Sequence, residues 1–193
     1  VNRQRERPRL RVIVQNHFRV SCPRPVNVFF KPPDKKAQAT MWTMFPIKPG
    51  TKVPVFSGDW RLHGSSDPDQ IEAWRDAGYD LAIDCEASGL LVIDLDGETG
   101  LATAATMDLP ETYTVQTPRG GRHLYYAGVG PSSVQKLGPK VDSRGTGGYV
   151  VWEGPGYEQI NGDAVLAVPD WIVPALNIRK DRKTAAVNEM DLP

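Results

Sequence analysis

The sequence predicts an α+β fold in which a compact, strand-rich sheet is flanked by helices. Three observations predict it: short apolar runs of strand length, Gly- and Pro-containing turns between them, and one helix with a clear capping signal. Hydrophobic residues make up 40% of the 193-residue chain and charged residues 24%, a globular balance. We expect one domain over residues 41–178, preceded by a basic arm or extension, residues 1–40, and followed by a polar tail, residues 179–193.

The net charge of zero conceals an asymmetry between the arm and the rest of the chain. Residues 1–40 contain ten Lys or Arg against Glu6 and Asp34, whereas residues 41–193 contain thirteen basic and twenty-one acidic residues. A basic arm neutralises phosphates and gives salt-sensitive affinity for nucleic acid. The alternative is a solvated tail, or upstream sequence read through before Met41.

Other features of the sequence bear on where the protein works. No apolar run approaches the roughly 20 residues that span a bilayer, and the basic start leads to no signal-type apolar stretch. Cys22 and Cys85 lack the paired spacing of a zinc site and are read as ordinary thiols. We therefore expect no membrane partner and a cytoplasmic location.

The first predicted elements are a strand and a helix. MWTMFPI reads as a strand, and KPGTKVP follows it as a turn. The clearest helix starts after Asp67, which caps it, has Pro68 at its first position, and ends at Gly78. Ile71 and Trp74 lie three residues apart and are expected to face the core.

The centre of the sheet is predicted at SGLLVIDLDG, because its Leu, Val and Ile run is typical of a buried strand. YDLAID precedes it as a strand, and TYTVQT, RHLYYA and GGYVVW follow, separated by Gly and Pro turns. Helices are expected between Glu98 and Met107 and from about Asp170 to Asn177. This order of elements indicates an α+β architecture.

Asp94 and Asp96 stand at the end of the apolar run. A strand sends residues i and i+2 to one face, so both carboxylates project together while Leu95 anchors the opposite face. At ~4 Å two carboxylates repel by about 1 kcal/mol in water and about 4 kcal/mol at an effective dielectric of 20. Such a pair favours a hard cation, Mg²⁺ or Mn²⁺. The alternative is a solvated pair that ends the strand, which the D-x-D pattern alone does not exclude.

The segment TPRGGRHLYY suits a phosphate. Gly120 and Gly121 allow close approach of a ligand to the backbone, Arg119 and Arg122 bring positive charge, and His123 follows on a strand face that can border a cleft. We find no packing purpose for PRGGR in the sequence. The alternative for the imidazole is an isolated structural or surface histidine.

A third polar segment is VDSRGTGGYVVW. Asp142 is a candidate third acid, and the forked guanidinium of Arg144 suits a triphosphate or ribose. The alternative is a surface Asp–Arg ion pair beside a hairpin turn. Tyr149 adjoins the Gly-rich turn and is expected to line a nucleotide pocket. Lys52, in KPGTKVP, is expected on the surface, with contact to a template or nucleotide phosphate as the alternative.

In combination and order, LVIDLDG, TPRGGRHLYY and VDSRGTGGYVV, preceded by FPIKPGTKVP, IEAW and YDLAI, resemble the bifunctional primase-polymerase (prim-pol) domain of the archaeo-eukaryotic primase superfamily, common in phage and plasmid replication proteins. The resemblance covers roughly residues 43–160. It implies a compact fold with an RRM-like catalytic sheet. It also implies that two aspartates of the first motif and one of the third bind catalytic metals, and that the histidine contacts the nucleotide. By match these are Asp94, Asp96, Asp142 and His123.

The activity implied by the resemblance is DNA-dependent primase or polymerase chemistry. A 3′-hydroxyl attacks the α-phosphorus of an NTP or dNTP at a two-metal Mg²⁺ or Mn²⁺ site on a DNA template and primer, with a replicative helicase as partner in cis or trans. His123, Arg144, Arg122 and Arg119 are the expected triphosphate contacts. Two alternatives remain open: a metal-dependent phosphodiester hydrolase, and a catalytically inactive nucleic-acid-binding or replisome-docking module.

Overall fold

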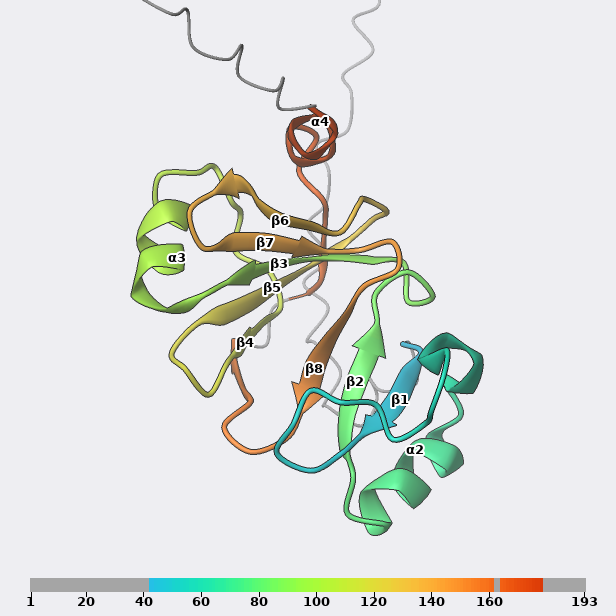
Figure 1. Cartoon of the computed structure of the whole chain (residues 1–193). Helices are drawn as coiled ribbons and strands as arrows, with labels where there is room; N and C mark the ends of the chain where they lie inside the picture. Colours follow the sequence, from blue (N-terminus) through green and yellow to red (C-terminus); the bar gives the residue numbers. More distant parts are fainter. Residues whose placement is uncertain (1–41, 162–163, 179–193) are drawn as a thin grey trace, which may run out of the picture.

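The computed structural model describes residues 42–161 and 164–178 (Figure 1). The predicted basic arm, residues 1–40, and the predicted tail, residues 179–193, lie outside this described part. Within it, two antiparallel sheets and a few short helices form an α+β fold, as predicted. No helix of the described residues is long and apolar enough to cross a membrane.

The smaller sheet has three strands in the order β1-β2-β8. Their bounds are Met44–Ile47 for β1, Asp80–Asp84 for β2 and Tyr149–Glu153 for β8. All three coincide with predicted strands. Both pairings are antiparallel, and β2 is the central strand.

The larger sheet has seven strands, six of them in the order β6-β7-β3-β5-β4-β9. Predicted strands among these are β3 (Leu90–Leu95), β4 (Thr114–Gln116) and β5 (Arg122–Ala127). Strands that the sequence reading did not place are β6 (Ser133–Gly138), β7 (Val141–Arg144), β9 (Glu158–Asn161) and β10 (Leu166–Ala167), the last pairing in parallel with β5. Every residue of β3 is buried, and β3 lies inside the sheet, as predicted.

The helices follow their sequence signals. In α2 (Pro68–Asp76) the Asp67 side chain accepts a hydrogen bond from the Asp69 N–H, and Ile71 is buried. Gly78 then takes a φ of 79°, which favours glycine and ends the helix. Helix α4 (Ile172–Asn177) lies within its predicted range, and helix α3 (Gly97–Ala104) begins one residue before the range predicted for it. A short 3₁₀ helix, η1 (Trp60–His63), was not predicted.

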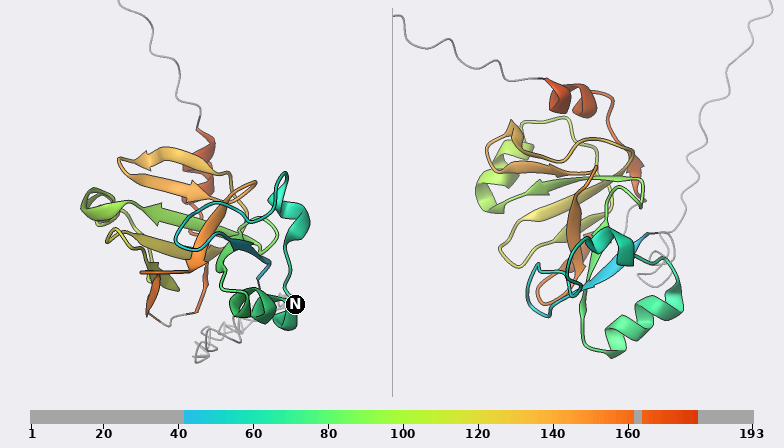
Figure 2. Two further views of the ribbon diagram at one scale, coloured as in Figure 1. Left: turned by 60° about the horizontal axis from the view of Figure 1, so that its bottom comes forward. Right: turned by 45° about the vertical axis from the view of Figure 1, so that its right-hand side comes forward.

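The two sheets share a core, and the larger sheet has a second core on its other face. Between the sheets, residues such as Val92 and Tyr125 pack with Trp152 and with Ile71 of α2. On the opposite face of the larger sheet, apolar side chains such as Ile93 pack with α3 and α4. Figures 1 and 2 show these two helices on the side of the larger sheet away from β1 and β2.

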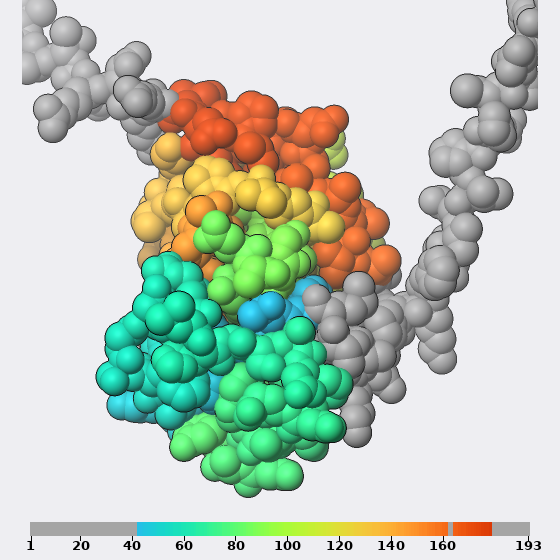
Figure 3. Space-filling model, turned by 90° about the vertical axis from the view of Figure 1, so that its right-hand side faces the viewer, coloured from blue at the N-terminus to red at the C-terminus, as the bar shows by residue number. Residues whose placement is uncertain are grey.

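The chain passes from one sheet to the other at two short connections. Residues 85–89 lead from β2 into β3, and residues 145–148 lead from β7 into β8. The space-filling view in Figure 3 shows the green β2–β3 connection between the turquoise part that holds η1 and α2 and the yellow-to-red part above it. The two crossings therefore join the sheets side by side and leave space between them at one end.

Candidate functional site

Three predicted polar residues lie in one row across the larger sheet. Strand β3 lies between β5 and β7, and the register places Asp94 opposite His123 on one side and opposite Asp142 on the other. Directly opposite residues of antiparallel strands point to the same face. The row therefore projects toward the space between the sheets.

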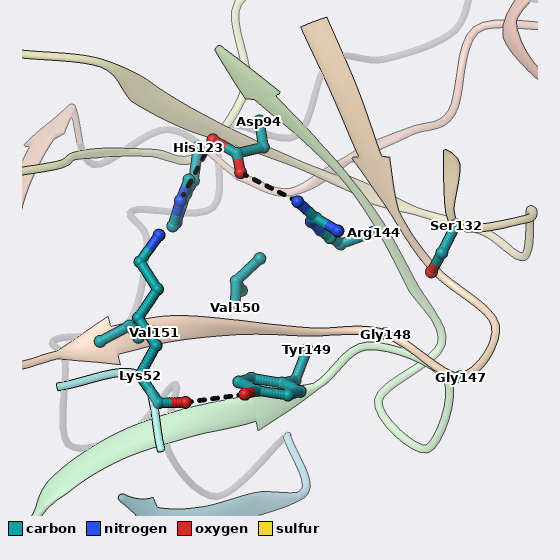
Figure 4. Close-up of a pocket in the computed structure, with 10 residues that line it drawn as sticks. All are labelled: Lys52, Asp94, His123, Ser132, Arg144, Gly147, Gly148, Tyr149, Val150 and Val151. Carbon is teal, nitrogen blue, oxygen red and sulfur yellow. Dashed lines mark hydrogen bonds and ion pairs between the residues drawn. The ribbon is translucent and has the colours of Figure 1, made fainter. Parts of the chain in front are cut away.

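The side chains of this row contact one another and Arg144 (Figure 4). Nε2 of His123 lies 3.5 Å from Oδ1 of Asp94, and Nη2 of Arg144 lies 3.9 Å from Oδ2 of Asp94. The same guanidinium nitrogen donates to Oδ2 of Asp142 at 2.9 Å. Arg144 thus lies between the two aspartates and offsets part of their mutual repulsion.

Asp142 is bonded on both carboxylate oxygens. Besides Arg144 on Oδ2, its Oδ1 accepts the backbone N–H of Gln135 at 3.0 Å. Gln135 belongs to β6 and has a φ of 50°, a conformation uncommon for a residue with a side chain. The irregular edge strand therefore turns an N–H toward this aspartate.

Asp96 lies just beyond β3, at the N-cap of α3. Its backbone is extended, yet its side chain makes no capping hydrogen bond. Together with Asp94 it lines a hollow of about 550 Å³. The structure therefore brings these two carboxylates to one cavity, although Asp96 follows the strand rather than belonging to it.

The carboxyl group of Asp94 is only 8% exposed, and burial raises its pKa to about 6. The neighbouring charge of Asp96 raises the pKa further, whereas the positive charges of Arg144 and Lys52 oppose the rise. A carboxylate whose ionised form is disfavoured in this way is stabilised by any cation that binds beside it.

His123 is 3% exposed, and burial lowers its pKa to about 3, with further lowering by Lys52 and Arg144. The imidazole is therefore neutral near pH 7, and its contact with Asp94 is not an ion pair. A neutral imidazole has one N–H donor and one acceptor nitrogen. The ring therefore adds no charge to the site, and its single N–H lies near the Asp94 carboxylate and the Val151 backbone.

Two hollows meet at Asp94 and His123. The first, of about 330 Å³, also contains Arg144, Tyr149 and the glycines of the β7–β8 connection. The second, of about 550 Å³, also contains Asp96 and Arg119. Three residues line both hollows: Lys52, Asp94 and His123.

Arg122 lies apart from the other predicted nucleotide contacts. It precedes His123 on β5, so its side chain projects to the opposite face of the sheet, where it is exposed. There it lines a third hollow with Leu101 and Leu124. The structure thus brings Arg119, Arg144 and Tyr149 to the cavities beside Asp94 but places Arg122 behind the sheet.

The paired glycines have a structural purpose that the sequence reading did not find. Gly120 and Gly121 form a tight turn with Thr117, whose carbonyl and hydroxyl oxygens accept their two N–H groups at 3.0 and 3.1 Å. A Cβ on Gly121 would overlap the carbonyl oxygen of Leu95 and lie 3.0 Å from the amide nitrogen of Gly97. The expectation that PRGGR has no packing purpose is therefore corrected, because Gly121 packs backbone against backbone.

The oxygen donors of the site are chemically suited to Mg²⁺ or Mn²⁺. Asp94 and Asp96 share a cavity, and neither makes a hydrogen bond that would fix both oxygens elsewhere in the described structure. Asp142 is adjacent in register but is held by Gln135 and Arg144. Across residues 42–161 and 164–178, no three His, Cys, Asp or Glu residues are arranged as a complete metal-binding group.

For Lys52 the structure favours the alternative that the sequence left second, a position beside the candidate site. Lys52 is exposed, as expected, yet it lines both hollows and lies next to His123 in Figure 4. A lysine within a Gly/Pro turn carries no local signal of this kind. Its place depends on the packing of the smaller sheet against the larger one.

Comparison of the sequence with known protein families identifies the family of this chain. Residues 34–171, most of the chain, match the family described as bifunctional DNA primase/polymerase, N-terminal. The chain belongs to the Prim-Pol family. No curated protein matches the chain.

Prim-Pol membership indicates nucleotidyl transfer of the primase or polymerase type in replication, with DNA and nucleotides as substrates. The match includes β1 to β10 and all three polar segments singled out in the sequence. Proteins of this kind are generally metal-dependent, which agrees with the donor chemistry of Asp94 and Asp96.

Proposed function

We propose that this Prim-Pol domain is a DNA-dependent primase or polymerase that transfers a nucleotide from an NTP or dNTP to a 3′-hydroxyl during phage or plasmid replication. One observation supports it above the others: the buried carboxylate of Asp94 lies at the junction of two cavities, beside a neutral His123 and with Asp96 in the same cavity. A replicative helicase, in cis or in trans, is the partner that this role implies.

In this proposal Asp94 and Asp96 hold Mg²⁺ or Mn²⁺, with Asp142 as third ligand. When bound, the ions would neutralise phosphate charge and favour deprotonation of the attacking hydroxyl. Asp142 joins the set only by releasing its bond to Gln135 or to Arg144. Burial of Asp94 strengthens the attraction, since the ionised carboxylate has little water around it.

The remaining residues bind and orient the nucleotide. Arg119 and Arg144 approach from the two hollows and suit phosphate oxygens, while neutral His123 lines both hollows and borders the nucleotide without adding charge. The 3′-oxygen then forms its bond to the α-phosphorus as the bond to the leaving pyrophosphate breaks. Fixed donors around the triphosphate stabilise the charge that develops on the leaving oxygens.

The direct test is Asp94→Ala in an assay of labelled-nucleotide incorporation on a primed DNA template with Mg²⁺ or Mn²⁺. We expect incorporation to fall by about a thousandfold or more, while template binding is unchanged. Asp76→Ala, an exposed carboxylate at the end of α2, is the matched control and should incorporate normally. Unchanged incorporation by Asp94→Ala would remove that residue from the proposal.

The wild-type protein separates the remaining alternatives in the same assay. Extension of the labelled primer supports the proposal. Shortening of the DNA would indicate phosphodiester hydrolysis, and template binding with no change in DNA length would indicate a catalytically inactive binding module.

We further propose that the basic residues 1–40 contribute to DNA binding through phosphate contacts. Removing them should weaken template binding and reduce the slope of its salt dependence, because fewer counterions are released. Equal salt slopes for the full chain and the shortened chain would contradict this role.

A further inference from the structure

The turn after β1, residues 48–53, is held in a defined shape. The Lys48 N–H donates to the Val53 carbonyl at 2.8 Å, and the Thr51 N–H and hydroxyl both donate to the Lys48 carbonyl. The Gly50 N–H donates to Oδ2 of Asp80 at 2.7 Å, which ties the turn to β2. The backbone from which the Lys52 side chain extends is therefore ordered by hydrogen bonds rather than left as a loose loop.

Tyr149 fixes this turn from a second strand. Its hydroxyl donates to the carbonyl oxygen of Lys52 at 2.7 Å, as Figure 4 shows. Its ring packs edge-on against Phe45 and Trp60, with centroid distances of 5.3 and 5.0 Å. Because the ring packs on Phe45 and Trp60 and the hydroxyl already donates to the Lys52 carbonyl, Tyr149 anchors the lysine and its O–H is not a free donor to a nucleotide.

The Lys52 ammonium is the cation at the junction of the two hollows. Its side chain points toward His123 in Figure 4, and it lines both cavities together with His123 and Asp94. Among the residues that the structure describes, no carboxylate forms an ion pair with it, whereas Arg144 is engaged by Asp142. A compact ammonium without a carboxylate partner is suited to a phosphate oxygen.

We propose that Lys52 binds the phosphate chain of the incoming nucleotide where the two hollows meet, and that Tyr149 is a positioning residue that holds Lys52 there. This inference rests on the proposed nucleotidyl-transfer function. It assigns to Tyr149 a role through its hydroxyl contact with the Lys52 backbone, in place of the direct nucleotide contact expected from the sequence.

The first test measures binding of dATP and ATP in the presence of Mg²⁺ by isothermal titration calorimetry, without turnover. Lys52→Ala should weaken binding of the preferred nucleotide by about tenfold or more, the usual effect of losing one charge-assisted contact. Lys48→Ala removes the same charge from the same turn but lines neither hollow, so its affinity should stay within about twofold of wild type. Nucleotide affinity of Lys52→Ala within twofold of wild type would overturn the assignment.

The second test is a double-mutant cycle between Lys52 and Tyr149. Tyr149→Phe keeps the ring and removes the hydroxyl, and should weaken nucleotide binding by about threefold in the wild-type background but by less than about 1.5-fold in the Lys52→Ala background. Tyr79→Phe, away from both hollows, is the matched control. An equal loss from Tyr149→Phe in both backgrounds would overturn the positioning role, because a general structural effect does not depend on Lys52.

The two proposals fail in different ways. Wild-type protein that binds nucleotide through Lys52 but extends no primer contradicts the proposed function and leaves the binding assignment standing. Wild-type protein that extends primers while Lys52→Ala binds nucleotide normally contradicts only the assignment of Lys52. Thermal unfolding of each variant shows whether a loss of binding follows from a loss of folded protein.

Discussion

The two faces of β3 do different work with neighbouring residues of one strand. Ile93 and Leu95 point to the face that α3 and α4 cover, where apolar side chains exclude water. Asp94 lies between them and points to the other face, where it meets His123 and the two hollows. Because side chains alternate along a strand, adjacent residues of β3 serve different purposes: one contributes to the core and the next to the candidate site. Substitutions on one face should change folding, and those on the other should change binding and catalysis.

The largest expected effect on stability comes from the covered face. Ile93→Ala removes a fully buried side chain and should lower the free energy of unfolding by about 2 to 5 kcal/mol, measured by urea denaturation. Val134→Ala, on β6 and 68% exposed, is the control and should change it by less than about 0.5 kcal/mol. Similar losses from both variants would contradict the assignment of this face as a buried core.

On the other face, removing a charge should stabilise the fold. The pKa of Asp94 is raised from 3.8 to about 6, so its ionised form is disfavoured in the folded state. That destabilisation is present above pH 6 and is lost as the pH falls from 6 toward 4. Asp94→Asn has no such charge and should raise the free energy of unfolding by about 3 kcal/mol at pH 8.

The measurement for Asp94→Asn is thermal or urea unfolding in EDTA at pH 8 and pH 4, since a bound cation would stabilise the wild type. The advantage of the variant should shrink at pH 4, where both proteins are neutral at this position. An advantage of equal size at both pH values would show that packing, rather than ionisation, causes it.

The two predicted arginines on opposite faces sharpen the comparison. Arg144 lines the hollow beside Asp94, whereas Arg122 lines the hollow behind the sheet. Arg144→Ala should therefore raise the KM for nucleotide by roughly tenfold, and Arg122→Ala should leave it within about twofold. Steady-state incorporation with varied nucleotide concentration checks both values. A larger increase in KM from Arg122→Ala than from Arg144→Ala would contradict nucleotide binding on the Asp94 face of the sheet.

The smallest effect is expected beneath the site. The Tyr125 hydroxyl is buried and has no hydrogen-bond partner in the described structure, so Tyr125→Phe should keep or raise the free energy of unfolding, by at most about 1 kcal/mol. Tyr113→Phe is the matched comparison, because the Tyr113 hydroxyl oxygen accepts the Trp152 indole N–H at 2.9 Å. That variant should lose about 1 kcal/mol. Chemical denaturation of the two proteins side by side distinguishes the two hydroxyls.

Local patterns in the sequence were enough to predict the elements that carry apolar side chains. The Leu, Val and Ile run of β3 and the Asp67–Pro68 start of α2 each determine structure within a few residues. Strand β6 was missed because three of its side chains are exposed and Gln135 has a positive φ, so it has no apolar alternation. Strand β9 was missed because its residues are mostly polar, and β10 because it is only two residues long.

The parts of the candidate site whose positions depend on strand alternation could be predicted from the sequence. The parts whose positions depend on packing between distant segments could not. Alternation placed each of these side chains on a strand face, and the resemblance to prim-pol domains grouped Asp94 with His123 and Asp142 as candidates, which the register brings together. The contact of Gln135 with Asp142 depends on the irregular strand β6. The approach of Lys52 to His123 depends on how the two sheets pack, which no local pattern encodes.

Close contact between Gly121 and the Leu95 carbonyl links the two ends of the site mechanically. The β4–β5 turn, which bears Arg119, rests directly on the β3–α3 junction, which bears Asp96, with no side chain between them. Displacing either segment therefore pushes on the other through main-chain atoms. An anion bound by Arg119 and a cation bound by Asp96 would therefore act on one rigid unit. Binding of either ion would fix the position of the side chain that binds the other.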